Sequence, residues 1–270
     1  MPRIGQVPGR IGDLKEGAAA DLTVDLVTYW KLDEDTSANR LDSVGTAHFI
    51  PGGSMPGNIN GIIAGCQTLK SQQVGAVMQS NLQTDVTTFD GTVDASLVFW
   101  VKEDFVNDPP VPGAEHNGFN VPILDTFRNS GAVLAGFRCL RNGFFEGNNR
   151  HWQVGIDTLD VTIGMPISGP DFEYLEWFMI TMIYSAGAGT LTVTGSGSDT
   201  FEAVDTTISS QSLVTGPGDG TTWMQIGGNT GGTPNGFAHV DEMGLWRRAL
   251  SVEDRTFLWN SGAGRTYPFT

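Results

Sequence analysis

Glycine and proline recur along the whole chain at a density that leaves room only for short secondary-structure elements. The sequence has 36 glycines and 13 prolines in 270 residues. Gly and Pro interrupt both helices and strands, and short apolar runs between such residues are typical of an all-β domain. Hydrophobic residues make up 39% of the chain and aromatic residues 10%, which is enough for a proper core. We therefore predict an all-β fold and exclude wholesale disorder.

The apolar runs predict which strands lie at the centre of the sheets. Residues 97–101 and 178–184 carry apolar side chains on both faces, as expected for strands that are covered on each side. Residues 190–194 alternate, and the Gly-Ala-Gly before them predicts a hairpin loop. Further clear strands are predicted at 27–32, 223–227 and 238–246, and weaker ones near 62–69, 74–79, 121–127, 132–140 and 152–157.

One helix is signalled near the C-terminus. Ser251 is a suitable N-cap, and Glu253 and Asp254 place negative charge in the first turn. The apolar residues 257–259 supply the packing face, and Gly262 is expected to end the helix.

The charge balance and the cysteine count restrict the possible partners and the redox chemistry. There are 30 acidic and 15 basic residues, so the net charge is −15. This balance argues against nucleic acid as a partner and against binding to an anionic membrane. No apolar run reaches membrane-spanning length, and the N-terminus lacks the apolar core of a signal peptide. Cys66 and Cys139 are expected as two buried thiols rather than a disulfide.

Residues 1–25 differ from the rest and are predicted to form an extended N-terminal arm ahead of a single domain at 26–270. Glycine and proline are too frequent here for a helix or a continuous strand. Spaced apolar residues and three basic residues suit a segment that docks on an acidic surface of a larger assembly. A frayed terminus is the alternative. The residues concerned are Ile4, Val7, Ile11, Leu14, Arg3, Arg10 and Lys15.

Both ends of the predicted domain resemble a known family. Residues 26–34 followed by 41–45 resemble the opening strand, acidic step and Asp-Ser turn of laminin-G-like domains, in the concanavalin-A-like lectin/glucanase superfamily. Residues 236–251 resemble the family's closing strand, with Asp241-Glu242 before an Arg-Ala-Leu-Ser step. The segments 55–90 and 104–150 depart from the pattern. The resemblance implies a two-sheet antiparallel jelly-roll sandwich with one short C-terminal helix, in which the first strand pairs with the last.

The superfamily includes glucanases, which carry paired catalytic carboxylates on one strand face. The Glu-x-Asp-x-x-Glu pattern of those enzymes does not occur. The candidate pairs are Asp33 with Asp35 and Glu173 with Glu176, and the former ends a strand beside a turn. We assign them structural roles and predict that the protein is not an enzyme.

The resemblance also implies a structural calcium ion near the first and last strands, held by oxygen ligands. The ligands that it suggests are Asp42 and Asp241. The alternative is an Asx turn at Asp42 and an arginine partner for Asp241. His239 shares a strand face with Asp241 and is expected to be structural rather than a metal ligand.

A sugar site requires aromatic platforms with polar neighbours. Residues 148–152 have that mixture, and Asn229 follows the strand that carries Trp223. The alternative is that each Trp is a core residue. The predicted ligand-binding residues are Asn148, Asn149, His151, Trp152 and Asn229.

Two classes of function follow from these features. The first hypothesis is a virion structural, decoration or tail-associated protein of a tailed phage, assembled in the host cytoplasm. It fits a chain with its own Met1, no export signal and few cysteines. Its partners would be other virion proteins, met through the arm, and it could form a homo-oligomer. The alternative is an extracellular or cell-surface lectin-like adhesion module that binds glycan. A glycoside hydrolase is third.

Overall fold

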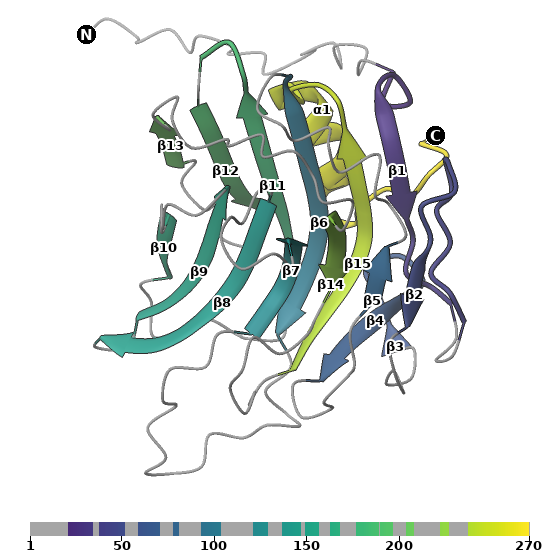
Figure 1. Ribbon diagram of the computed structural model, residues 1–270, viewed down its shortest axis with the longest axis horizontal. Coiled ribbons are helices and arrows are strands. Elements are labelled where there is room, and N and C mark those ends of the chain that lie inside the picture. The colour runs from purple at the N-terminus through teal and green to yellow at the C-terminus, as the bar shows by residue number, and fades with distance from the viewer. Residues whose placement is uncertain are drawn as a thin grey trace, which may run out of the picture.

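The computed structural model describes residues 21–34, 38–51, 59–70, 78–80, 93–103, 121–128, 137–146, 149–156, 163–167, 177–188, 190–196, 204–207, 222–226 and 237–269. These residues form strands, one α-helix and a short 3-10 turn (Figure 1). The elements are β1 (Leu26–Trp30), β2 (Phe49–Pro51), β3 (Ile59–Asn60), β4 (Gly65–Lys70), β5 (Met78–Ser80), β6 (Ala95–Glu103), β7 (Val121–Arg128), β8 (Phe137–Glu146), β9 (Asn149–Ile156), β10 (Ile163–Ile167), β11 (Phe178–Ser185), β12 (Thr190–Ser196), β13 (Val204–Thr207), β14 (Thr222–Ile226), β15 (Phe237–Trp246), α1 (Val252–Trp259) and η2 (Asn260–Gly262).

The strands form two antiparallel sheets, which confirms the predicted fold class. The first sheet has the order β13-β12-β11-β6-β15-β4-β3, with β1 also paired to β15. The second has the order β10-β9-β8-β7-β14-β5-β2. Neighbours in each sheet are often distant in sequence, as in a jelly roll. Within the described residues, no helix is both long and apolar enough to pass through a membrane.

The predicted pairing of the first strand with the last is confirmed. β1 and β15 run antiparallel, with Leu26 opposite Trp246 and Trp30 opposite Met243. Both tryptophans are fully buried, so they contribute to the core as expected. A register shift between Leu26 and Thr28 marks a β-bulge. The extra residue changes the alternation, which allows Leu26 and Tyr29 to join the same buried cluster.

The strands that sequence reasoning missed are all at sheet edges. β2 and β10 end the second sheet, and β3 and β13 end the first. Two of them contain proline, Pro51 and Pro166, which lacks the backbone N–H that an interior strand needs. The weaker predicted strands are displaced at their ends: β8 spans 137–146 instead of 132–140, and β9 spans 149–156 instead of 152–157.

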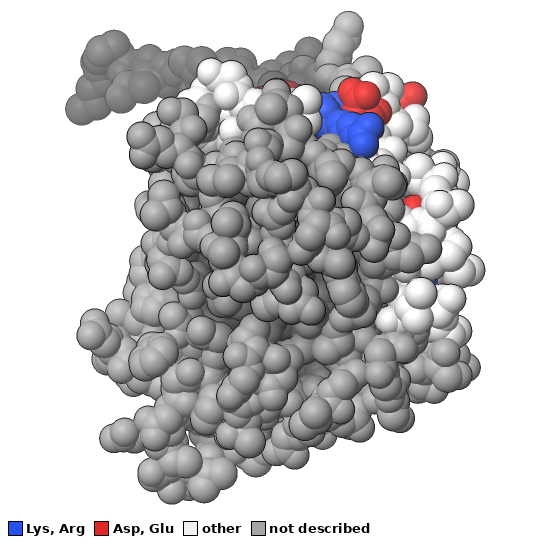
Figure 2. Space-filling view, viewed as in Figure 1, with Lys and Arg blue, Asp and Glu red and all other residues white. Residues whose placement is uncertain are grey.

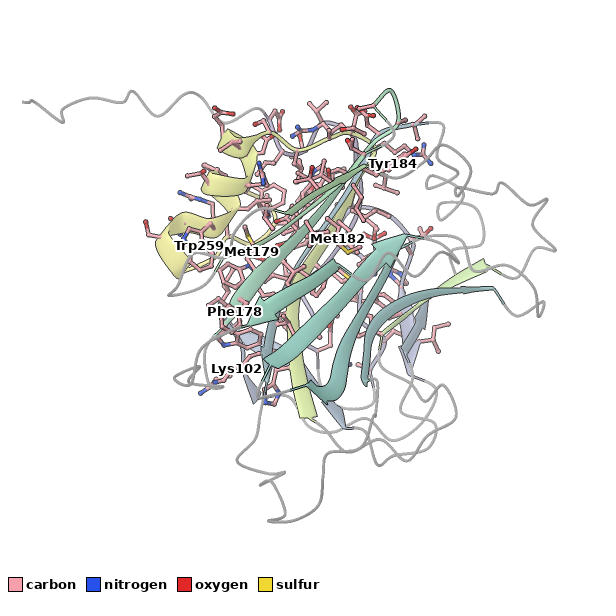
Figure 3. The ribbon with its side chains drawn as sticks, turned by 90° about the vertical axis from the view of Figure 1, so that its left-hand side faces the viewer. Lys102, Phe178, Met179, Met182, Tyr184 and Trp259 are labelled. Atoms are coloured by element: carbon pink, nitrogen blue, oxygen red, sulfur yellow. The ribbon has the colours of Figure 1, made fainter. Side chains whose placement is uncertain are left out.

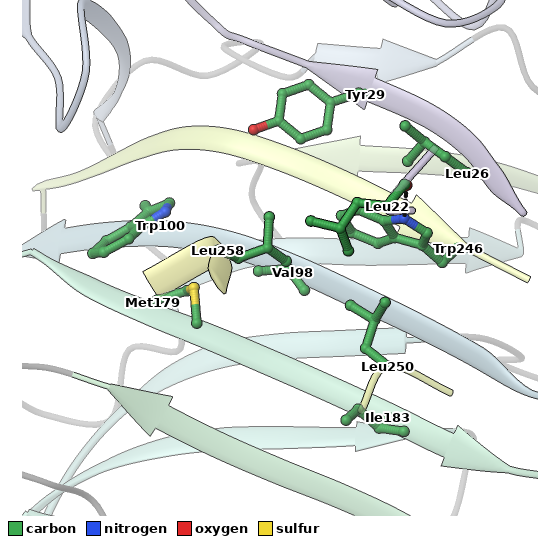
Figure 4. Close-up of a cluster of buried hydrophobic side chains, with 10 residues drawn as sticks. All are labelled: Leu22, Leu26, Tyr29, Val98, Trp100, Met179, Ile183, Trp246, Leu250 and Leu258. Carbon is green, nitrogen blue, oxygen red and sulfur yellow. Dashed lines mark hydrogen bonds between the residues drawn. The ribbon is translucent and has the colours of Figure 1, made fainter. Parts of the chain in front are cut away.

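Both faces of the central strands are buried, as predicted, and α1 supplies a third layer. Figure 3 shows α1 on one side of the first sheet and the second sheet on the other. The face toward α1 carries a cluster of buried apolar side chains (Figure 4). Its members are Leu22, Leu26, Tyr29, Val98, Trp100, Met179, Ile183, Trp246, Leu250 and Leu258. Because two layers cover the centre of the first sheet, the central strands β6 and β11 are continuous apolar runs.

The start of α1 is as predicted, but its end is not. Ser251 caps the helix and forms a reciprocal capping box with Asp254. Asp254 also pairs with Arg248 at 2.6 Å, which ties the helix to the chain that leaves β15. Gly262 was expected to end the helix, whereas α1 stops at Trp259 and Asn260 takes the left-handed conformation with φ 47°. Asparagine tolerates that conformation better than most residues, so it replaces glycine as the C-cap here.

The last residues of the predicted arm pack on the domain. Leu22 is 3% exposed within the core cluster, and its carbonyl oxygen accepts a hydrogen bond from Trp246 Nε1 at 2.8 Å. The packed part of the domain therefore begins before residue 26. Residues 1–20 lie outside the described residues, so the docking role of the arm stays a prediction.

The two cysteines lie on different sheets. Cys66 is on β4 and is buried, and its thiol donates a hydrogen bond to the carbonyl oxygen of Asn60 at 3.7 Å. Cys139 is on β8 of the second sheet, and its side chain lies outside the described residues. The expected thiol at Cys66 is therefore present, and that at Cys139 stays a prediction.

Candidate functional site

An acidic pair lies where β15 changes partners along one edge. β4 pairs with β15 from Phe237 to Val240, and β1 pairs with it from Met243 to Trp246. Asp241 and Glu242 fall between these two pairings. We call the junction of β1, β4 and β15 at these residues the seam. Figure 1 shows β1 and β4 following β15 one after the other.

A β-bulge in β15 brings the two carboxyl groups together. The register with β6 shifts between Asp241, opposite Trp100, and Gly244, opposite Val98. Three steps along β15 thus match two along β6, and Glu242 takes a positive φ of 46°. Consecutive residues of a regular strand point to opposite faces, so the bulge is what allows both side chains into the seam.

A third carboxyl group comes from the segment that follows β1. Leu32 has a φ of 62°, a conformation that is unfavourable for a branched side chain, and Asp33 follows it directly. One oxygen each of Asp33, Asp241 and Glu242 lies within 4.8 Å of the others. Asp241 and Glu242 are 0% and 3% exposed, whereas Asp33 is half-buried.

Backbone amides and one tyrosine hold the buried pair. Oδ2 of Asp241 accepts a hydrogen bond from the Ile62 N–H at 2.8 Å, in the turn between β3 and β4. The Tyr29 hydroxyl lies 2.7 Å from Oε2 of Glu242 and 3.1 Å from the carbonyl oxygen of Arg265. A hydroxyl has one proton, so it donates to Glu242 when that group is ionised. When Glu242 is protonated, it can donate to Tyr29, whose proton then turns to Arg265.

Burial makes this an unfavourable place for negative charge. It raises the pKa of Asp241 to about 9, with the neighbouring Glu242 adding to the effect. It also raises the pKa of Glu242 to about 7, although the hydrogen bond from Tyr29 opposes the shift. Burial and Glu34 raise the pKa of Asp33. Asp241 therefore retains its proton at neutral pH unless a cation replaces it.

The seam differs from the predicted calcium site at one of its two residues. Asp241 belongs to the three-carboxyl group, but Asp42 does not. Asp42 Oδ1 accepts hydrogen bonds from Tyr29 N and Val44 N, and Oδ2 accepts one from Ala47 N. The bond to Val44 is the Asx turn that the sequence analysis gave as the alternative. The carboxylate oxygens of Asp42 thus bind backbone N–H groups of the loop after β1 instead of joining the three-carboxyl group.

Two members of the seam were missed by sequence reasoning. Asp33 was assigned a structural role at a strand end, and Glu242 was treated only as part of a family motif. The available signal was the pair Asp241-Glu242 within an otherwise apolar strand, because buried adjacent carboxyls need a special partner or a proton. The three oxygen donors are of the type that Ca²⁺ prefers.

The predicted sugar-binding residues lie mainly on β9. His151 pairs with Asn142 and Pro166, and Trp152 pairs with Arg141 and Met165, so β9 lies between β8 and β10. Asn149 begins the strand. The side chains of these three residues, and Asn148 and Asn229 altogether, lie outside the described residues. This site stays a prediction.

The comparisons with known proteins show similarity of fold only. No protein-family model matches the sequence, and no curated protein matches it. The binding domain of Paraclostridial Mosquitocidal Protein 1 superposes with a TM-score of 0.54 and 15% identity, over 88% of this chain and 52% of that one. The binding domain of Botulinum Neurotoxin DC in complex with SialylT has a TM-score of 0.60 and 13% identity, over 88% and 51%.

A third similar structure, of botulinum neurotoxin type C, concerns cell entry that depends on interaction with two ganglioside molecules. It has a TM-score of 0.58 and 14% identity, over 88% of this chain and 51% of that one. The chain thus spans about half the length of these structures. They support a β-rich fold of the kind found in binding domains, and membership in the laminin-G-like family stays an interpretation.

Proposed function

We propose that this protein is a non-catalytic recognition domain that binds glycan at a cell surface. The observation that carries the proposal is the likeness of fold, over 88% of the chain, to two binding domains, one of them in complex with SialylT, and to a botulinum neurotoxin structure concerned with gangliosides. This favours the lectin-like hypothesis over the virion-structural one. The chain matches only about half the length of those structures, so their binding residues cannot be transferred to it. The binding residues are therefore argued from this chain's own side chains.

The position of the carboxyl groups supports a non-catalytic role. A glycosidase places two carboxyl groups on either side of a sugar, with an open cleft between them. Asp241 and Glu242 are almost completely buried, and the Ile62 amide and the Tyr29 hydroxyl already contact their oxygens. A sugar could reach them only if the strands separated. The seam is therefore better suited to holding the strands together than to hydrolysis.

We also propose that the seam binds a structural divalent cation, with Asp33, Asp241 and Glu242 as protein ligands. The three oxygens come from β15 and from the segment that follows β1. A cation there would supply the positive charge that the buried carboxyl groups lack, and so join the two strands. Calcium is the expected ion because it accepts carboxylates and backbone carbonyls in flexible numbers.

The proposed function is tested by screening the purified 270-residue chain on a glycan array, with and without calcium. Isothermal titration of each positive glycan then gives an affinity. We expect reproducible binding to a defined set of sugars. The Trp152→Ala variant tests the predicted site on β9, because loss of binding with an unchanged melting temperature would assign the sugar to that strand. A chain that binds no glycan under either condition would overturn the proposal.

The virion role stays a prediction, and its test is separate. Deletion of residues 1–20 leaves the buried Leu22 in place. If the arm attaches the domain to an assembly, the deletion prevents assembly without changing glycan binding.

A further inference from the structure

The outer face of the first sheet continues beyond α1 as a row of three polar and aromatic side chains. In β6, Val98 and Trp100 face α1, so Lys102 lies on the same face by alternation. His239 is opposite Lys102 on β15. Phe178 of β11 is opposite Val101, so Trp177 comes next and flanks Lys102 from the other side. We call Trp177, Lys102 and His239 the outer row.

The two rings of the outer row lean toward each other across β6. Their centroids are 6.4 Å apart. The strands that carry them are separated by β6, and two strand spacings amount to about 9.6 Å. The imidazole of His239 is 2% exposed and forms the inner wall. Trp177 and Lys102 are only half-buried, so the indole and the ammonium group are the parts that a ligand can contact.

Within the described residues, Lys102 has no carboxylate partner, in contrast to two other basic residues of this acidic chain. Arg248 pairs with Asp254 at 2.6 Å, and Lys31 lies close enough to Asp33 to lower its pKa. On the face shown in Figure 2, the described basic atoms likewise lie beside acidic ones. Among the residues that the structure describes, no carboxylate pairs with the ammonium of Lys102.

A nearby acidic residue on this face is already engaged by the protein backbone. Asp241 lies opposite Trp100, but it is 0% exposed and its Oδ2 accepts a hydrogen bond from the Ile62 N–H at 2.8 Å. In Figure 3, Lys102 lies on the same side of the first sheet as Trp259 and close to Phe178. Trp259 stacks on Trp100 with ring centroids 5.0 Å apart, so the outer row borders a rigid aromatic surface.

We infer that the outer row binds an acidic sugar, with the sugar ring stacked on Trp177 and its carboxylate paired with Lys102. An indole face accepts the apolar C–H side of a sugar, and an ammonium group attracts a carboxylate most strongly where few other charges compete. His239 supports the indole from within. This inference rests on the proposed function and specifies its ligand class and its place, on the first sheet rather than on β9.

The test compares sialyllactose with lactose, which differ by the acidic sugar alone, in titrations with the full chain at low salt. We expect sialyllactose to bind at least tenfold more tightly. Lys102→Gln should remove this preference, and Lys102→Arg should retain most of it. Trp177→Ala should weaken both sugars at least tenfold, with partial rescue in Trp177→Phe. Arg255→Gln, which removes a half-buried cation of α1, is the matched control and should change neither affinity.

Each outcome decides between the inference and the function on which it rests. Sialyllactose binding that is unchanged in Lys102→Gln, or lost only in Trp152→Ala, overturns the outer row but leaves glycan recognition intact. Equal affinity for lactose and sialyllactose also overturns the inference that the ligand is an acidic sugar. If the unmodified chain binds neither these sugars nor any glycan on the array, both proposals fail. Melting curves for every variant ensure that a loss of binding is not a loss of fold.

Discussion

Replacing Asp241 by asparagine should stabilise the metal-free protein, although the change removes a buried hydrogen-bonding carboxyl group. Asparagine has nearly the same shape, and its side-chain oxygen can still accept the hydrogen bond from Ile62 N, which measures 2.8 Å in the structure. Its amide nitrogen can donate to the Glu242 carboxyl group, but it cannot accept from the Glu242 N–H, which bonds to Oδ1 at 3.0 Å in the structure. The substitution therefore removes the titratable charge and retains the hydrogen bond from Ile62, at the loss of the one from Glu242 N.

The magnitude follows from the pKa of Asp241, which rises from 3.8 to about 9 on folding. Above pH 3.8 the unfolded chain loses this proton and the folded chain retains it, so stability falls as pH rises. Each pH unit costs about 1.4 kcal/mol, so the loss reaches about 4 kcal/mol at pH 7 as an upper limit. The asparagine side chain of the variant does not titrate. The variant and the parent should therefore be similar near pH 4 and diverge up to pH 9.

The assay is thermal unfolding by circular dichroism from pH 4 to pH 9, with EDTA and again with excess calcium chloride. In EDTA at pH 7 we expect Asp241→Asn to melt higher, by on the order of 10 °C for a domain of this size. In calcium the order should reverse if the seam binds the ion, because the parent gains the binding energy and the variant loses a ligand. Glu253→Gln, an exposed carboxylate of α1, is the control.

One result would refute the reasoning about the seam altogether. If Asp241→Asn and the parent have parallel pH profiles in both EDTA and calcium, Asp241 ionises in the ordinary range and holds no cation. If Asp241→Asn melts higher than the parent in EDTA and also in calcium, only the proposal that the seam binds a cation is refuted.

Three further predictions concern the structure around the seam. Asp254→Ala should lower the free energy of unfolding in urea by about 3 kcal/mol, because it leaves Arg248 without its buried partner and removes a helix cap. The control Glu253→Ala should change that free energy by less than about 0.5 kcal/mol, and equal losses in the two variants would argue against the ion pair. Gly61→Ala should destabilise the chain by about 1–3 kcal/mol, since an added Cβ would overlap the Gly65 carbonyl oxygen and Oδ2 of Asp241. Deletion of residues 1–20 should preserve a cooperative melt but abolish assembly, as measured by light scattering; collapse of the melt would place the arm in the core.

The sequence alone was sufficient for the features that depend on neighbouring residues. Apolar runs at 97–101 and 178–184 predicted central strands, since burial on both faces imposes continuous hydrophobicity. The Ser251 cap was readable because its partner Asp254 is three residues away. The short edge strands were not readable, because a strand such as Val204–Thr207 forms only where a neighbour offers it a free edge.

The candidate sites were decided by tertiary structure, because their members meet only through strand register. Residues 33, 62 and 241 come together where β15 passes from β4 to β1. A bulge of one residue then determines that Glu242 joins Asp241. The family resemblance suggested Asp42 as a ligand and left Asp33 a structural role, yet three backbone N–H groups engage Asp42 while Asp33 reaches the seam. The outer row likewise depends on the order β11-β6-β15, which residue types do not encode one by one. Local pattern determines which side chains are buried, whereas non-local pairing determines which buried side chains are neighbours.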